Sequence, residues 1–122
     1  MNAQMIIKLK VKIKSLAAEA SIIRREENKA KKTIRWARSN EARTQEYAAV
    51  QLRDSLAEHR RFHLRPEQRC SNLAYGYLRG VPYKRIEQKC HQPPDWARVM
   101  NIAERFGGGN VDNELTAWRK TE

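Results

Sequence analysis

The chain has 122 residues and a formal net charge of +11. This length suffices for one small domain with a modest hydrophobic core. No run of about eighteen apolar residues is present, which excludes a helical membrane span. Abundant Ala, Arg, Lys, Glu and Leu, with only five Gly and four Pro, favour an all-α fold. We expect no secretory signal peptide, and the use of only two cysteines indicates an intracellular, cytoplasmic protein.

The positive charge is concentrated near the N-terminus. Residues 1–38 hold eleven Lys and Arg against three acidic residues, a net charge of +8. Residues 39–65 carry +1, residues 66–106 carry +3 and residues 107–122 carry −1. A field of this size attracts polyanions. The sequence therefore predicts contact with nucleic acid, either DNA or RNA, or with a nucleoprotein complex.

Residues 5–14 alternate between apolar side chains and lysines, a pattern typical of a strand with one wet face. A longer pattern competes with it, because apolar residues recur at spacings of three and four far beyond residue 14. This pattern predicts one long helix over 3–38 with a coiled-coil seam, and the strand is the alternative. The seam consists of Ile6, Leu9, Ile13, Leu16, Ala20, Ile23, Ala30, Ile34 and Ala37, and only Glu27 interrupts it.

Ser39 and Asn40 mark the predicted end of this helix, because Asn tolerates the left-handed conformation that ends helices and both side chains compete for backbone hydrogen bonds. A second helix is predicted from Glu41 to Leu64, and Ala49 and Leu52 continue the same spacing. The two helices are expected to fold into a long antiparallel hairpin over 1–65. If the second helix leaves the seam uncovered, we expect a homodimer through the N-terminal helix.

Arg65-Pro66 marks the next predicted boundary, because the residue before Pro is disfavoured in the α conformation and Pro suits a first helical turn. A compact three-helix unit is predicted over 66–106. Its first helix ends at Gly80-Val81-Pro82, its second spans Tyr83 to Cys90, and its third begins near Asp95. The apolar faces of the first and third helices consist of Leu73, Ala74, Tyr77, Leu78, Trp96, Val99, Met100, Ala103 and Phe106.

The segment Gly80-Val81-Pro82-Tyr83-Lys84-Arg85-Ile86 resembles the turn and recognition-helix start of helix-turn-helix DNA-binding units. The resemblance covers residues 67–90, and Gly76 stands at the small position one turn before the turn. Pro82 stands where such units usually carry Ser, and Arg79 and Lys89 stand where apolar residues are usual. The resemblance implies a helix that reads nucleic acid, and a plain helical core is the alternative.

Gly107-Gly108-Gly109 predicts a flexible stop, which begins a tail over 107–122. Asp112 is a candidate N-cap, and Val111, Leu115 and Trp118 recur at helical spacing. The tail is predicted to form a short docking helix. An exposed Trp118 that contacts a partner is the alternative.

A zinc site is a further candidate. His59 and His63 lie one helical turn apart, and Cys70 and Cys90 would complete four ligands. No Cys-x-x-Cys pair is present, and buried thiols are common in such apolar helical surroundings. The carboxylates are dispersed beside Arg or Lys, as in surface ion pairs, and no Gly-rich loop precedes a helix. We therefore expect a protein that is not an enzyme and has no metal or cofactor.

The predicted nucleic-acid-binding residues form three groups. The first follows the long helix, the second lies near the far end of the hairpin, and the third surrounds the Gly-Val-Pro-Tyr turn. Arg there can make bidentate contacts and Tyr can stack on a base. A solvated helix face is the alternative for each group. In chain order the residues are Lys8, Lys10, Lys12, Lys14, Arg24, Arg25, Lys31, Lys32, Arg35, Arg60, Arg61, Arg79, Tyr83, Lys84, Arg85 and Lys89.

These features predict a small non-enzymatic protein that binds phosphate backbones through helical Lys and Arg faces. The alternative is a protein-binding module that docks on a larger nucleoprotein complex. In profile, although not in motif, the chain is similar to phage-encoded inhibitors of host complexes. No membrane partner is expected.

Overall fold

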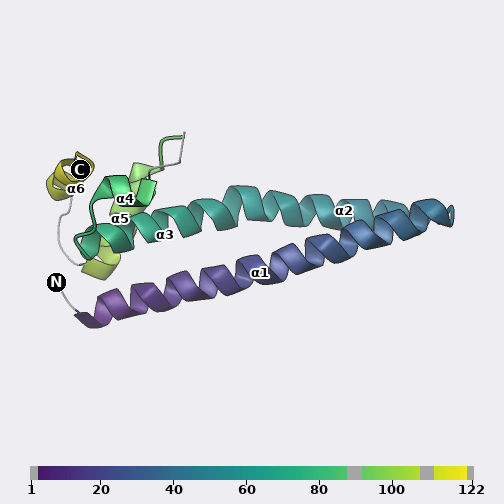
Figure 1. The fold of residues 1–122 in the computed structure, drawn as a ribbon, viewed down its shortest axis with the longest axis horizontal. Helices are drawn as coiled ribbons and strands as arrows, with labels where there is room; N and C mark the ends of the chain where they lie inside the picture. Colours follow the sequence, from purple (N-terminus) through teal and green to yellow (C-terminus); the bar gives the residue numbers. More distant parts are fainter. Residues whose placement is uncertain (1–2, 88–91, 108–111, 121–122) are drawn as a thin grey trace. The chain divides into compact units, whose positions relative to one another are not determined.

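The structure is a computed structural model that describes residues 3–87, 92–107 and 112–120 (Figure 1). These residues form helices joined by short turns, and none of them lies in a β-strand. The prediction of an all-α fold is confirmed. No helix in this part of the chain combines the length and the apolar character that a bilayer span requires.

Helix α1 spans Ala3–Ser39, so the long N-terminal helix is confirmed and the strand over 5–14 is wrong. No Gly or Pro interrupts this stretch, and a helix can bury its 3-4 seam along one side. Glu27, which interrupts the apolar pattern, is buried with the seam. The buried apolar members of the seam are Leu9, Ile23, Ala30, Ile34 and Ala37.

Helix α1 ends at the predicted position in a Schellman motif, in which an N–H beyond the helix bonds a carbonyl five residues back. The Ala42 N–H donates to the Ala37 carbonyl at 2.8 Å. Glu41, rather than Asn40, takes the left-handed conformation, with φ at 54°. The Asn40 side chain instead donates to the Trp36 carbonyl at 2.8 Å, so it secures the last turn.

Helices α2 (Arg43–His59) and α3 (Arg65–Leu78) are joined without a break by a π-helical segment, η1 (Arg60–Leu64). The helical run therefore continues through the predicted boundary at Arg65-Pro66, although a division between two compact units falls at this bond. Proline lacks an N–H, and its ring crowds the carbonyl four residues earlier in a regular α-helix. Here the Arg65 N–H donates to the Arg60 carbonyl, five residues back. This wider turn accommodates Pro66 within the helical run.

The chain forms two compact units. One comprises residues 16–65, and the other combines residues 1–15 with residues 66–122. Within the 16–65 unit, α1 and α2 are antiparallel. The Arg38 side chain bonds Glu46 near the turn, whereas Arg60 at the end of the unit bonds Glu27.

The unit of residues 1–15 and 66–122 contains the short helices α4 (Tyr83–Glu87), α5 (Trp96–Gly107) and α6 (Asp112–Trp118). As predicted, Gly80 follows α3 with a positive φ of 74°. Asp95 caps α5, since its Oδ1 accepts the Arg98 N–H at 3.2 Å. The predicted second helix extends to Cys90, but residues 88–91 lie outside the described part of the chain. The core consists of Leu9, Cys70, Leu73, Ala74, Leu78, Val99, Ile102, Ala103, Leu115 and Trp118.

Helix α6 docks on its own unit. The Trp118 side chain is only 7% exposed, and its indole Nε1 donates to the Val81 carbonyl at 2.7 Å. The predicted docking helix is thus correct, and an exposed Trp118 is wrong. Val111 lies outside the described residues.

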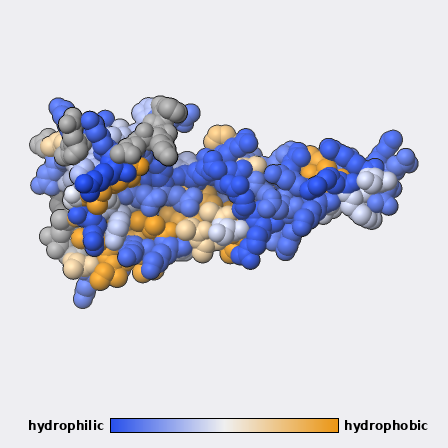
Figure 2. All heavy atoms as spheres, in the orientation of Figure 1, coloured by the Kyte–Doolittle hydropathy of each residue, from blue (hydrophilic) through white to orange (hydrophobic). Residues whose placement is uncertain are grey.

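The surface is dominated by hydrophilic side chains, as the view in Figure 2 shows. Orange hydrophobic atoms nevertheless gather along the N-terminal half of α1 in that view. Ile7 and Val11 belong to this half and are 62% and 61% exposed. Apolar exposure on α1 is therefore separate from the buried seam.

Candidate nucleic-acid interface

Five cations of α1 share one side of the helix in the 16–65 unit, and together they define the cationic strip. Arg24, Lys31 and Arg35 fall close to one line, because seven and eleven residues approximate two and three full turns. This line is about 16 Å long at the helical rise. The acids of the same stretch, Glu19, Glu26 and Glu27, lie toward the seam side, so the strip has one sign of charge. The members of the strip are Arg24, Arg25, Lys31, Lys32 and Arg35, and all are exposed.

The buried Glu27 explains why the apolar seam is interrupted. Arg60 approaches it across the helix pair, with Nε 2.8 Å from Oε2 and Nη2 3.1 Å from Oε1. The Glu27 side chain is only 5% exposed, and the Arg60 side chain is 16% exposed. The hydrogen bonds from Arg60 lower the pKa of Glu27 despite the opposing effect of burial, and the charges of Lys31 and Arg24 lower it further. The sequence predicts Arg60 as a phosphate contact, but its guanidinium is engaged in the ion pair with Glu27.

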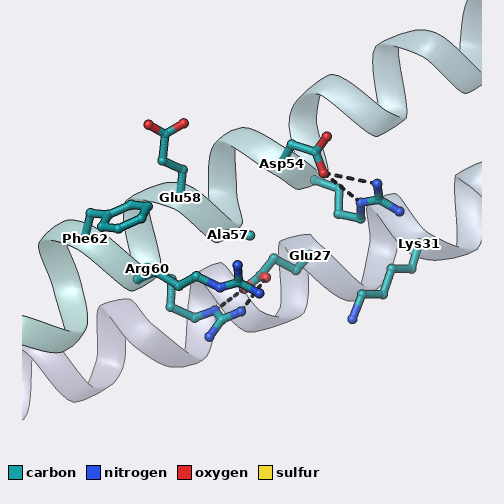
Figure 3. Close-up of a pocket in the computed structure, with 9 residues that line it drawn as sticks. Glu27, Lys31, Asp54, Ala57, Glu58, Arg60 and Phe62 are labelled. Atoms are coloured by element: carbon teal, nitrogen blue, oxygen red, sulfur yellow. Dashed lines mark hydrogen bonds and ion pairs between the residues drawn. The ribbon is translucent and has the colours of Figure 1, made fainter. Parts of the chain in front are cut away.

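A groove of about 510 Å³ borders this pair (Figure 3). It contains carboxylates as well as cations, because Asp54 and Glu58 lie on its α2 side. Arg53 bonds Asp54, with Nη2 3.1 Å from Oδ1. A polyanion would be repelled by these acids. The groove is therefore a weaker polyanion site than the strip beside it, although Arg61, a predicted contact, lines it and is exposed.

The N-terminal lysines belong to the unit of residues 1–15 and 66–122, and they differ in how exposed their side chains are. Lys8, Lys10 and Lys14 are exposed. Lys12 is half-buried and bonds Glu67 with Nζ 2.6 Å from Oε1. Its Nζ also lies 5.9 Å from the ring centroid of Phe106. Lys12 therefore holds α1 to α3, while its three neighbours remain accessible.

The turn between α3 and α4 brings the two helices close together, and we call it the α3–α4 corner. A Cβ atom at Gly76 would overlap the Ile86 side chain, so a small residue is required there. The Val81 N–H donates to the Gly76 carbonyl at 2.9 Å, which closes a Schellman motif around Gly80. The cations presented at this corner are Arg79, Lys84 and Arg85, and all are exposed.

Tyr83, the predicted stacking residue of this corner, is half-buried in an aromatic cluster. Its ring centroid lies 5.5 Å from that of Trp96 and 5.3 Å from that of Trp118. The ring therefore stabilises the unit and is only partly accessible. Lys89, the last predicted contact, lies outside the described residues.

An ion pair that fixes the corner was not foreseen from the sequence. Arg69 bonds Glu87 with Nη2 2.6 Å from Oε2, and the same nitrogen donates to the Gln92 carbonyl at 2.6 Å. The Glu87 side chain is only 8% exposed. Periodicity gives no signal for this contact, because the partners are eighteen residues apart.

The predicted zinc ligands do not form a metal cluster within the described residues. His59 and His63 stack with ring centroids 5.6 Å apart, and His59 Nε2 lies 3.4 Å from Glu19 Oε1. Cys70 is 1% exposed in the core of the other unit. Its thiol donates to the Asp95 carbonyl at 3.7 Å, and burial raises its pKa, which disfavours the thiolate that zinc binds. Cys90 falls outside the described part of the chain.

Comparison with known proteins adds no assignment. No protein-family model, no curated protein and no solved structure matches this chain. The accessible cations are the main chemical feature of the surface.

Proposed function

We propose that the chain is a small, non-enzymatic, intracellular protein that binds nucleic acid through phosphate contacts and needs no cofactor. The observation that carries this proposal is the cationic strip. Its five side chains are exposed and of one sign, and no ion pair within the described residues engages them. Exposed Lys and Arg on a rigid helix attract phosphates without sequence preference, and each contact releases counterions.

The α3–α4 corner is proposed to add a second contact. Gly76 admits the Ile86 side chain and Gly80 adopts the positive φ of the turn, which supports the resemblance to helix-turn-helix units. Arg85 is exposed beside this turn, and Arg can bond a guanine edge or a phosphate with two donors. The compact units differ from the predicted division into 1–65, 66–106 and 107–122, because residues 1–15 belong to the same unit as residues 66–122.

The proposal is tested by fluorescence anisotropy of labelled duplex and single-stranded oligonucleotides at about 50 mM salt. We expect binding that weakens steeply as salt rises. The double variant Lys84→Glu/Arg85→Glu should weaken binding about tenfold or more, because two attractive charges become repulsive. Absence of any binding at low salt would sink the proposal.

A second candidate function is docking on a partner protein within a nucleoprotein complex. It is favoured by a groove of about 350 Å³ between α1 and α2, which is lined by Glu26, Lys29, Ala30, Thr33, Gln45, Ala48, Ala49 and Leu52. Ile22, Trp36 and Leu52 of the same unit are 53%, 55% and 50% exposed. Small residues that line a groove between two helices suit the apolar face of a partner helix.

Recovery of partners from a nuclease-treated lysate separates the two functions. A protein that remains bound after nuclease treatment and is lost on Leu52→Glu would favour the second function. Loss of all bound material with the nucleic acid would favour the first. A homodimer through the predicted seam is not proposed, because Ile23, Ala30 and Ile34 are already buried within the unit.

A further inference from the structure

A second cavity lies in the unit of residues 1–15 and 66–122, and we call it the aromatic pocket. It has a volume of about 430 Å³, within the range of small-molecule sites. Three separate segments build it: the start of α4, the stretch before and at the start of α5, and the end of α6. Its lining residues are Tyr83, Pro93, Pro94, Trp96, Thr116, Arg119 and Lys120, and none of these is acidic.

Trp96 forms the flat wall of the pocket. Its ring is half-buried and meets the Tyr83 ring at 5.5 Å between centroids, with 50° between the planes. The Arg119 guanidinium carbon lies 4.0 Å from the Trp96 ring centroid. Arg119 and Lys120 are both exposed. The pocket therefore combines an aromatic face with two exposed cationic side chains.

Helix α6 is fastened so that these two cations stay beside the pocket. Trp118 bonds the Val81 carbonyl and is nearly buried. The Tyr77 hydroxyl donates to Glu114 Oε2 at 2.8 Å. These contacts fix the end of α6 against the α3–α4 corner. Trp96 is consequently the accessible indole of this unit, and Trp118 is a structural one.

We propose that the aromatic pocket binds one unpaired nucleobase together with its adjoining phosphate. The base stacks on Trp96 in the place that the Arg119 guanidinium now occupies, in the pocket that Pro93 and Pro94 also line. Arg119 and Lys120 then contact the phosphate. An exposed cation–π contact is weaker than base stacking on an aromatic ring, so the exchange is favourable.

This inference rests on the proposed function and adds a preference for single strands. Bases in a duplex are stacked on each other and cannot enter a pocket without unpairing. The cationic strip, by contrast, accepts the phosphates of either form. Two cations without a carboxylate favour a nucleotide over a proline-rich peptide, which carries no phosphate.

The test compares an unstructured single strand of about 12 nucleotides with a duplex of equal length, by anisotropy and by quenching of tryptophan fluorescence. Trp96→Ala should weaken single-strand binding about tenfold or more and abolish most of the quenching. Duplex affinity should stay within about twofold of that of the unchanged chain, because phosphate contacts elsewhere are retained.

Arg119→Gln tests the same pocket without a risk of unfolding, because the Arg119 side chain is exposed and its replacement leaves the core intact. It should weaken single-strand binding about two- to fivefold and reduce the salt dependence by about one unit of slope. Arg105→Gln, on an exposed position of α5 in the same unit, is the matched control and should change neither value. Circular dichroism establishes that each variant is folded.

The outcomes distinguish the two proposals. If single strands bind but Trp96→Ala and Arg119→Gln behave like the unchanged chain, the pocket assignment is overturned and nucleic-acid binding stands. If neither oligonucleotide binds at low salt, both proposals fall. Quenching of Trp96 by a proline-rich peptide but not by the single strand would also overturn the assignment.

Discussion

The two units of the chain are stabilised in different ways. The unit of residues 1–15 and 66–122 buries large side chains such as Leu73 and Val99, both 0% exposed. The 16–65 unit instead buries fewer large apolar side chains, namely Ile23, Ile34 and Leu64, together with three alanines and the Glu27–Arg60 ion pair. Burial of apolar area supplies most of the folding free energy, whereas a buried ion pair chiefly fixes which helix faces meet. The comparison indicates that stability is concentrated in the first unit and pairing register in the second.

The ends of two helices repeat this contrast. Both α1 and α3 end in a Schellman motif, which needs a left-handed residue. In the α3–α4 corner that residue is Gly80, which adopts the conformation without strain. At the end of α1 it is Glu41, for which the same conformation is strained. The 16–65 unit thus carries a local strain that the α3–α4 corner lacks.

The largest expected effect is loss of core volume in the first unit. Leu73→Ala should lower the free energy of unfolding by about 2–5 kcal/mol, because it leaves a cavity in a closed core. Leu52→Ala, at a half-exposed leucine of the 16–65 unit, should cost less than about 1 kcal/mol. Urea denaturation followed by circular dichroism measures both. Equal losses would erase the contrast between the units.

The next effect concerns the ion pair. Glu27→Leu should destabilise the chain by about 2–3 kcal/mol, because Arg60 is left half-buried without its partner. Addition of Arg60→Leu should restore most of that loss, since an apolar pair of similar volume often replaces a buried ion pair. The double-mutant cycle gives the coupling energy. A double variant as unstable as Glu27→Leu would show that Arg60 itself is not the source of the cost.

The two helix ends should respond in opposite directions. Gly80→Ala should destabilise by about 1–2 kcal/mol, because a Cβ atom is unfavourable at positive φ. Glu41→Gly should raise the free energy of unfolding by about 0.5 kcal/mol, because the relief of backbone strain exceeds the conformational entropy that Gly loses on folding. Thermal unfolding of the two single variants provides the measurement. A destabilised Glu41→Gly would refute the strain assigned to α1.

The smallest effects should appear in how the stability of the fold depends on pH. Burial, together with Glu114, raises the pKa of Tyr77 to about 12. The unfolded pKa is near 10, so this contribution to stability is complete below pH 10 and is lost as pH rises toward 12. The pKa of Glu27 is lowered, so its contribution is present above the unfolded value of 4.5 and is lost on acidification. Tyr77→Phe should therefore flatten the alkaline limb of a stability profile, and Glu27→Leu the acid limb.

The elements that depend on local sequence were predictable. The 3-4 seam gave α1, the side chains at Ser39-Asn40 marked its end, and Gly80 and Asp95 placed the next turn and cap. In each case the residues that predict the feature lie in one continuous stretch of sequence. Local patterns therefore suffice for helices and their ends.

The features that depend on distant contacts were not predictable. Pro66 is a helix-start signal locally, yet the π-helical turn before it lets the helix continue. Glu27 interrupts the apolar seam in the sequence, and only its ion pair with the distant Arg60 explains why it is buried there. The aromatic pocket joins three segments that no periodicity connects. The sequence also predicted too many nucleic-acid contacts, because Lys12 and Arg60 form ion pairs with Glu67 and Glu27 within the chain.

The central claim is that the cationic strip binds phosphates, and the salt dependence of duplex binding tests it most directly. Arg24→Gln/Lys31→Gln/Arg35→Gln should reduce the slope of log K against log salt by about two to three units. The control Arg43→Gln/Arg65→Gln/Arg105→Gln removes the same charge from exposed positions outside the strip, and should reduce the slope by less than about one unit. Equal slopes for the two triple variants, or an unchanged chain that binds no duplex at low salt, would contradict the account.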